Sequence, residues 1–65
     1  MMDQYLIDAL KAKYQADMAE ANANIQVYLN NPAGIGEHPD IIAAIDTQVE
    51  LYAAAKEKLE VLDEF

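Results

Sequence analysis

Apolar residues in the first half of the chain recur at steps of three and four, a spacing typical of one face of an α-helix. The pattern predicts a helix over about residues 3–30, with Asp3 as its N-cap. The predicted apolar stripe consists of Ile7, Leu10, Tyr14, Met18, Ala21, Ile25 and Tyr28.

The second half shows the same spacing, which predicts a helix over about residues 39–64. Pro39 suits a first helical turn, where its missing N–H costs nothing. Asp40 beside it favours the positive end of the helix dipole. The predicted stripe consists of Ile41, Ile45, Val49, Tyr52, Leu59 and Leu62, and Lys56 interrupts it with a stem that can lie along apolar surface.

Both prolines and both glycines lie between positions 32 and 39, which predicts a loop over about residues 31–38. A short connection between two long helices favours antiparallel neighbours. We therefore expect an all-α fold, an antiparallel two-helix hairpin that forms a single domain over residues 1–65. Folding the chain about the loop pairs residues whose numbers sum to roughly 69. These pairs are Ile7 with Leu62, Leu10 with Leu59, Tyr14 with Ala55, Met18 with Leu51 or Tyr52, and Ile25 with Ile45 or Ala44.

A second apolar face lies opposite the main stripe of the first predicted helix. It is called the alanine face below and consists of Tyr5, Ala9, Ala12, Ala16, Ala19, Ala23 and Val27. Alanine is the best helix former and can simply fill exposed positions. However, two apolar faces on one helix need two neighbours, and a hairpin supplies one. A chain of 65 residues without cysteine also needs a stabilising partner. We therefore expect a homo-oligomer, a four-helix or larger bundle.

Charge excludes several classes of partner. Twelve acidic residues against four lysines and no arginine give a formal net charge of −8. Nucleic-acid binding requires clustered Lys and Arg, and an anionic membrane surface would repel this chain. No apolar run reaches the ~18 residues of a membrane span, and the N-terminal residues lack the basic start of a signal peptide. We expect a cytoplasmic protein with no nucleic-acid or membrane partner.

The sequence contains few residues that could act in catalysis. There is no cysteine or serine to act as a nucleophile, and His38 is the single histidine. The carboxylate pairs Asp46/Glu50 and Glu60/Glu64 are four residues apart and are expected to form a solvated acidic face. We expect no enzymatic activity, no cofactor and no metal site.

Two groups of residues are candidates for binding. The loop and the start of the second helix are a candidate partner-binding site. The alternative is that the loop only reverses the chain between the helices, since Gly34 and Gly36 can supply the positive φ angles of a turn. The loop candidates are Asn31, Pro32, Gly34, Ile35, Gly36, Glu37, His38 and Asp40. The four lysines, which the hairpin register places at one level, are candidates for an anion-binding site, with surface salt bridges as the alternative. They are Lys11, Lys13, Lys56 and Lys58.

The chain resembles a known group of proteins in three segments: Ile25 to Asp40, Ile45-Asp46 and Ala55 to Leu59. The most specific part of the resemblance runs from Asn31 to Pro39. The chain resembles small uncharacterised acidic proteins of tailed bacteriophages, in particular marine cyanobacterial phages of the T-even-like group. The resemblance implies a phage protein of no assigned activity, located in the infected bacterial host or in the virion. The leading hypothesis is a minor virion component or host-takeover factor that acts by self-association and by contact with a host or virion protein. The alternative is an oligomer that sequesters a small anionic or nucleotide ligand.

Overall fold

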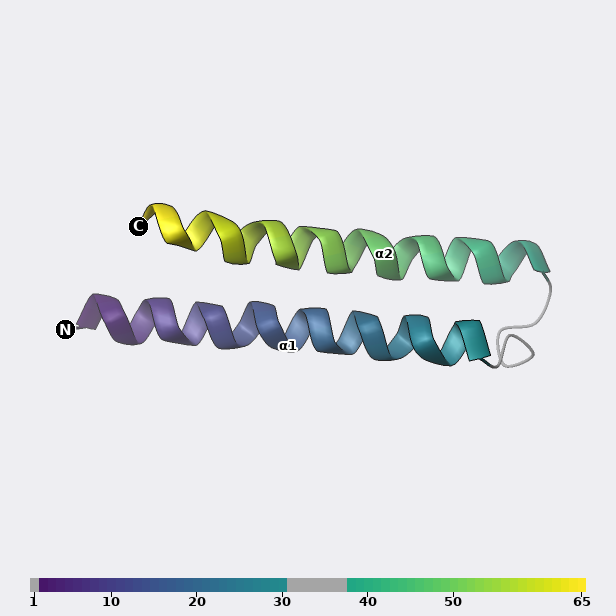
Figure 1. Cartoon of the computed structure of the whole chain (residues 1–65), viewed down its shortest axis with the longest axis horizontal. Helices are drawn as coiled ribbons and strands as arrows, with labels where there is room; N and C mark the ends of the chain where they lie inside the picture. The colour runs from purple at the N-terminus through teal and green to yellow at the C-terminus, as the bar shows by residue number, and fades with distance from the viewer. Residues whose placement is uncertain (1, 31–37) are drawn as a thin grey trace.

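The computed structural model describes residues 2–30 and 38–65, with the side chains of residues 3–30 and 40–65. Helix α1 spans Met2–Asn30 and helix α2 spans His38–Val61, followed by a short 3-10 turn, η2, over Leu62–Glu64. Figure 1 shows the two helices lying side by side in opposite directions, with both chain ends at the same end of the hairpin. The predicted all-α antiparallel hairpin is confirmed.

Local chemistry accounts for the helix ends that the structure describes. Asp3 lies inside the first turn of α1, because the helix begins one residue earlier than predicted, so Asp3 complements the helix dipole from within the helix and is not the N-cap. The Asn30 amide Nδ2 donates a 2.7 Å hydrogen bond to the Gln26 carbonyl, which satisfies one acceptor of the last turn. Asp40 in the first turn and Lys58 in the last turn of α2 have the favourable signs for its dipole.

The two helices meet along a heptad seam. Buried and half-buried residues alternate at steps of four and three along each helix, which is the spacing of coiled-coil contact positions. The seam of α1 consists of Ile7, Lys11, Tyr14, Met18, Ala21, Ile25 and Tyr28. The seam of α2 and η2 consists of Ile41, Ile45, Gln48, Tyr52, Ala55, Leu59 and Leu62.

Part of the predicted stripe is wrong. Leu10 is 37% exposed and Val49 is 49% exposed, and the half-buried seam positions beside them are Lys11 and Gln48. The physical reason is that the four-three alternation fixes which positions face the neighbouring helix, whether or not an apolar residue occupies them. Of the two alternatives predicted as partners for Met18, Tyr52 is half-buried in the seam and Leu51 is 53% exposed on its flank.

The register also differs from the prediction. Two side-chain contacts across the interface join Asn24 to Gln48 and Tyr14 to Lys58, and the residue numbers sum to 72 in each pair (24 + 48 and 14 + 58). Relative to the predicted sum of roughly 69, α2 is displaced along α1 by up to three residues, less than one helical turn.

The core of this hairpin is very small. Among the described side chains, only Ala21 and Ala55 are buried, at 2% and 4% exposure. The chain measures 50 × 15 × 12 Å with a radius of gyration of 15.0 Å, against about 11 Å for a compact domain of this length. It exposes 5007 Å², whereas a compact monomer of 7.2 kDa exposes roughly 4100 Å². The excess of about 900 Å² is the area that one subunit typically contributes to a stable protein interface.

Candidate interaction surfaces

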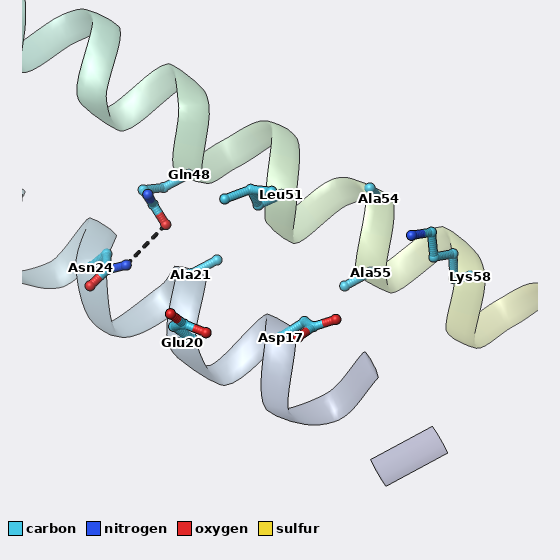
Figure 2. Close-up of a pocket in the computed structure, with 9 residues that line it drawn as sticks. All are labelled: Asp17, Glu20, Ala21, Asn24, Gln48, Leu51, Ala54, Ala55 and Lys58. Atoms are coloured by element: carbon cyan, nitrogen blue, oxygen red, sulfur yellow. Dashed lines mark hydrogen bonds between the residues drawn. The ribbon is translucent and has the colours of Figure 1, made fainter. Parts of the chain in front are cut away.

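A shallow groove of about 260 Å³ runs between the helices at the middle of the hairpin. Figure 2 shows its lining, with residues of α1 on one side and residues of α2 on the other. The lining residues are Asp17, Glu20, Ala21, Asn24, Gln48, Leu51, Ala54, Ala55 and Lys58. The two buried alanines are among them, so the groove exists because their small side chains leave the space above the seam unfilled.

An amide pair closes one end of this groove. The Asn24 Nδ2 group donates a 3.1 Å hydrogen bond to the Gln48 Oε1 atom, and both side chains are half-buried (Figure 2). Each amide satisfies the other across the helix interface, which limits the cost of removing them from water.

Charged groups form the rim of the groove. The Lys13 ammonium lies 3.4 Å from an Asp17 carboxylate oxygen, one helical turn away on α1, and both groups are substantially exposed. The Lys58 ammonium lies 5.8 Å from the centre of the Tyr14 ring, within the range of a cation–π interaction. Within residues 3–30 and 40–65, Lys58 and Glu20 form no ion pair, so their charges remain available to a neighbouring molecule.

The four lysines lie on two different flanks of the hairpin. Residues two apart on a helix lie about 200° apart around its axis, so Lys11 and Lys13 point to different flanks, as do Lys56 and Lys58. Lys58 lines the groove and Lys13 bonds to a groove residue, whereas Lys11 is half-buried in the seam and Lys56 is exposed. The four lysines, which were expected at one level, therefore form two pairs: Lys13 with Lys58 on the groove flank, and Lys11 with Lys56 on the other.

The outer faces of the two helices differ in chemistry. Every residue of the alanine face of α1, from Tyr5 to Val27, is exposed. On α2 the face opposite the seam carries an acidic ridge, made of Asp46, Glu50, Glu57 and Glu60, all exposed. Solvent therefore meets small apolar side chains on one outer face and carboxylates on the other.

Most of the loop candidates cannot be placed. Residues 31–37, which include Asn31, Pro32, Gly34, Ile35, Gly36 and Glu37, lie outside the described residues. His38 is the first residue of α2, and the Asp40 side chain is exposed in its first turn. Among the groups that the structure describes, no three His, Asp or Glu side chains gather in a way that would hold a metal ion.

The comparisons with known proteins found no relative of this chain. No protein-family model, no curated protein and no solved structure matches this chain, so nothing among them links it to phage proteins. The phage setting stays a prediction of the sequence. Neither described helix contains a segment long and apolar enough to cross a membrane.

The sequence interpretation missed the groove. Asn24, Gln48 and Asp17 were not selected as candidates, and Leu51 was considered only as an alternative to Tyr52 at the seam. A strict four-three spacing through Ala21 and Ala55 would have placed these four residues at seam or flanking positions. Two small residues at facing seam positions would also have indicated unfilled space between the helices.

Proposed function

We propose that this chain is a non-enzymatic helical protein that works by associating with copies of itself into a four-helix or larger bundle, and that the bundle presents its outer surfaces to a protein partner. One observation carries the proposal: among the side chains that the structure describes, the buried core consists of two alanines, Ala21 and Ala55. A two-helix hairpin that buries so little gains too little hydrophobic free energy to offset the entropy of ordering its residues.

The exposed apolar residues supply what such an assembly would bury. Among the side chains of residues 3–30 and 40–65, ten large apolar ones are at least 37% exposed, and covering them removes the cost of their hydration. They are Tyr5, Leu6, Leu10, Val27, Leu29, Ile42, Val49, Leu51, Val61 and Phe65. The excess area of about 900 Å² is enough for one standard contact with a second subunit.

The acidic ridge suits a different kind of contact. Carboxylates on the outer face of α2 cost too much to bury without partners, so an assembly leaves them in water. A surface of this kind attracts a basic protein partner by long-range electrostatics. The absence of serine and cysteine from the sequence supports a role in binding, because the common nucleophiles are missing.

Light scattering behind a sizing column, at several protein concentrations, tests the proposal. The expected result is a mass that is a whole multiple of 7.2 kDa at micromolar concentrations. A helical chain that keeps the mass of one subunit at every concentration would overturn it.

A further inference from the structure

We propose that two copies of this chain join tail to tail, through an apolar cluster at the end of the hairpin where both chain ends lie (Figure 1). The two hairpins overlap only near these ends, and their loop ends point away from each other. This inference rests on the proposed self-association and names the surface and the orientation that produce it. The cluster is called the chain-end cluster below and consists of Leu6, Leu10, Val61 and Phe65.

The chain-end cluster joins residues of both helices at the same levels along the hairpin. Residues at one level have numbers that sum to about 72, as the contacts across the interface show. Leu6 and Phe65 sum to 71, and so do Leu10 and Val61 (6 + 65 and 10 + 61). Each pair therefore lies at one level to within a single residue, about 1.5 Å. The exposed fractions of Leu6, Leu10, Val61 and Phe65 are 64%, 37%, 40% and 90%.

Heptad spacing places most of the cluster on the groove flank, the side of the hairpin on which the groove opens. Leu10 lies seven residues before Asp17, and Val61 lies seven residues after Ala54, and both of these partners in spacing line the groove. Leu6 is one helical turn before Leu10 on the same side of α1. The fourth member follows the 3-10 turn, in which residues three apart lie above one another, so it continues the seam at the end of the hairpin.

Charged residues bound the cluster on the same flank. Asp3 lies seven residues before Leu10, toward the chain ends, and Lys13 lies three residues after it. Lys58 lies at the level of Tyr14, one residue beyond Lys13. The cluster therefore has an acid at one edge and two lysines at the other. Within the two stretches whose side chains are described, neither Asp3 nor Lys58 forms an ion pair.

A two-fold axis through the chain-end cluster matches its two edges. The axis runs across the groove flank from α1 to α2, so it sets α1 against α1 of the second copy and α2 against α2. When it crosses the hairpin midway between Asp3 and Lys13, it exchanges the levels of these two residues. Each Asp3 then meets Lys13 of the other copy, with Lys58 one residue from the same level, so the charges at the rim are complementary.

The same axis brings apolar residues together at the centre of the contact. It also lies midway between Leu6 and Leu10, so Leu6 of one copy meets Leu10 of the other. On the side of α2, Phe65 lies one residue from the level of the axis and meets Phe65 and Val61 of the other copy. The contact has an apolar centre and a charged rim, which is the usual anatomy of a specific protein interface.

The distribution of net charge along the hairpin favours this arrangement. Residues 1–16 and 56–65 contain six acidic residues and four lysines, a net charge of −2. Residues 17–55 contain six acidic residues and no lysine, a net charge of −6 with histidine neutral. Tail-to-tail contact joins the less charged halves and keeps the −6 halves apart, whereas packing along the whole length sets each −6 half beside a second copy.

Charge reversal at Asp3 tests the rim, because Asp40 supplies a matched control. Both are exposed aspartates in the first turn of a helix, so replacement by lysine has the same effect on the helix dipole and on net charge. Asp3→Lys sets two lysines against each other and should raise the dissociation constant of self-association at least tenfold, whereas Asp40→Lys should change it less than threefold. Adding Lys13→Asp to Asp3→Lys keeps the net charge at the natural −8 and should restore the dissociation constant to within about threefold.

An apolar pair on α1 gives a second, independent test. Leu6→Ser in the chain-end cluster should raise the dissociation constant at least tenfold. Leu29→Ser, at the loop end of the same helix, should change it less than threefold, although the two leucines are similarly exposed at 64% and 59%. Sedimentation velocity gives the dissociation constants, and circular dichroism checks that each variant keeps its helices.

The length of the assembled particle tests the orientation directly. The proposed axis makes the two hairpins overlap from Met2 to Tyr14, about 18 Å at a rise of 1.5 Å per residue. Two 50 Å hairpins that overlap by this much form a particle about 80 Å long, whereas two hairpins packed side by side stay about 50 Å long. Small-angle X-ray scattering of the natural chain measures this dimension.

The outcomes separate this inference from the proposed function. A natural chain that stays monomeric at every concentration overturns both. A natural chain that associates into a particle about 50 Å long, or whose association responds equally to the chain-end variants and to their controls, overturns the tail-to-tail contact and leaves self-association standing. The contact is supported when the particle is about 80 Å long, both chain-end variants weaken association, both controls do not, and the charge exchange restores it.

Discussion

The Asn24 amide donates a 3.1 Å hydrogen bond to the Gln48 side-chain oxygen, joining two residues that are 24 positions apart in sequence. Within the described parts of the chain, it is the one side-chain hydrogen bond that crosses from α1 to α2. Gln48 occupies a seam position, where apolar residues are the norm in coiled-coil packing. A polar group at such a position favours the register that satisfies it, so this pair selects one alignment of the two helices.

Removal of either amide should therefore cost stability, and removal of both should cost less than the sum. We expect Asn24→Ala and Gln48→Ala each to lower the free energy of unfolding by about 1 kcal/mol, with a coupling of about 0.5–1 kcal/mol in the double-mutant cycle. Urea denaturation at a fixed protein concentration measures all four chains. Asn22→Ala is the control, because Asn22 is exposed on the same helix. A coupling near zero would mean that the amide bond does not set the register.

Overpacking the small core gives a second prediction. Ala55 is 4% exposed where the helices approach closely, so Ala55→Leu inserts three carbons between α2 and α1, below the open groove. We expect a loss of about 1–3 kcal/mol in the free energy of unfolding, because neighbouring side chains must leave their preferred rotamers. Ala53→Leu, at an exposed position of the same alanine run, should change stability by less than about 0.5 kcal/mol. Thermal and urea denaturation distinguish the two, and equal effects would show that the helices are not closely packed at Ala55.

The sequence was enough to predict the hairpin, because helix formers fill both halves of the chain and the prolines and glycines are confined to residues 32–39. Residues such as Ile7, Tyr14 and Ile25 were also assigned correctly to the seam, since they are apolar and occupy contact positions. Lys11 and Gln48 were not assigned to the seam, because the prediction was based on apolar side chains and so did not consider polar residues at seam positions. Leu10 and Val49 took their places in the prediction.

The groove was harder to predict for a related reason. It depends on the size of Ala21 and Ala55, on their facing each other, and on a register displaced by up to three residues from the predicted one. Charge patterning alone could not show that Lys13 and Lys58 share a flank, because that requires knowing which sides of the two helices face the same way. The loop, which supplied the most specific part of the resemblance, lies outside the described residues and contributes nothing to the site.

Self-association should depend on ionic strength in a direction set by net charge. Each copy carries −8, so two copies repel each other over distances of about 30 Å at 0.01 M salt and about 10 Å at 0.1 M. We expect the dissociation constant to fall by roughly tenfold between these two conditions, because screening weakens the long-range repulsion more than it weakens pairs buried in the contact. Sedimentation velocity in the two buffers measures it. Asp46→Asn with Glu50→Gln, on the acidic ridge, should reduce the effect, and association that weakens with salt would show that attraction between charges dominates.

Lys11 offers a prediction in the opposite direction, a gain in stability. Its side chain is half-buried at a seam position of α1, where its stem covers apolar surface but its ammonium must reach water. Lys11→Leu removes that constraint and adds apolar contact with α2, so we expect the free energy of unfolding to rise by about 0.5–1 kcal/mol. Lys56→Leu makes the same change at an exposed position and should alter stability by less than about 0.5 kcal/mol. Both are compared with the natural chain by urea denaturation at one protein concentration, since assembly itself contributes to stability. A destabilised Lys11→Leu chain would show that the lysine is required at the seam, and that the four-three pattern does not by itself define an apolar interface there.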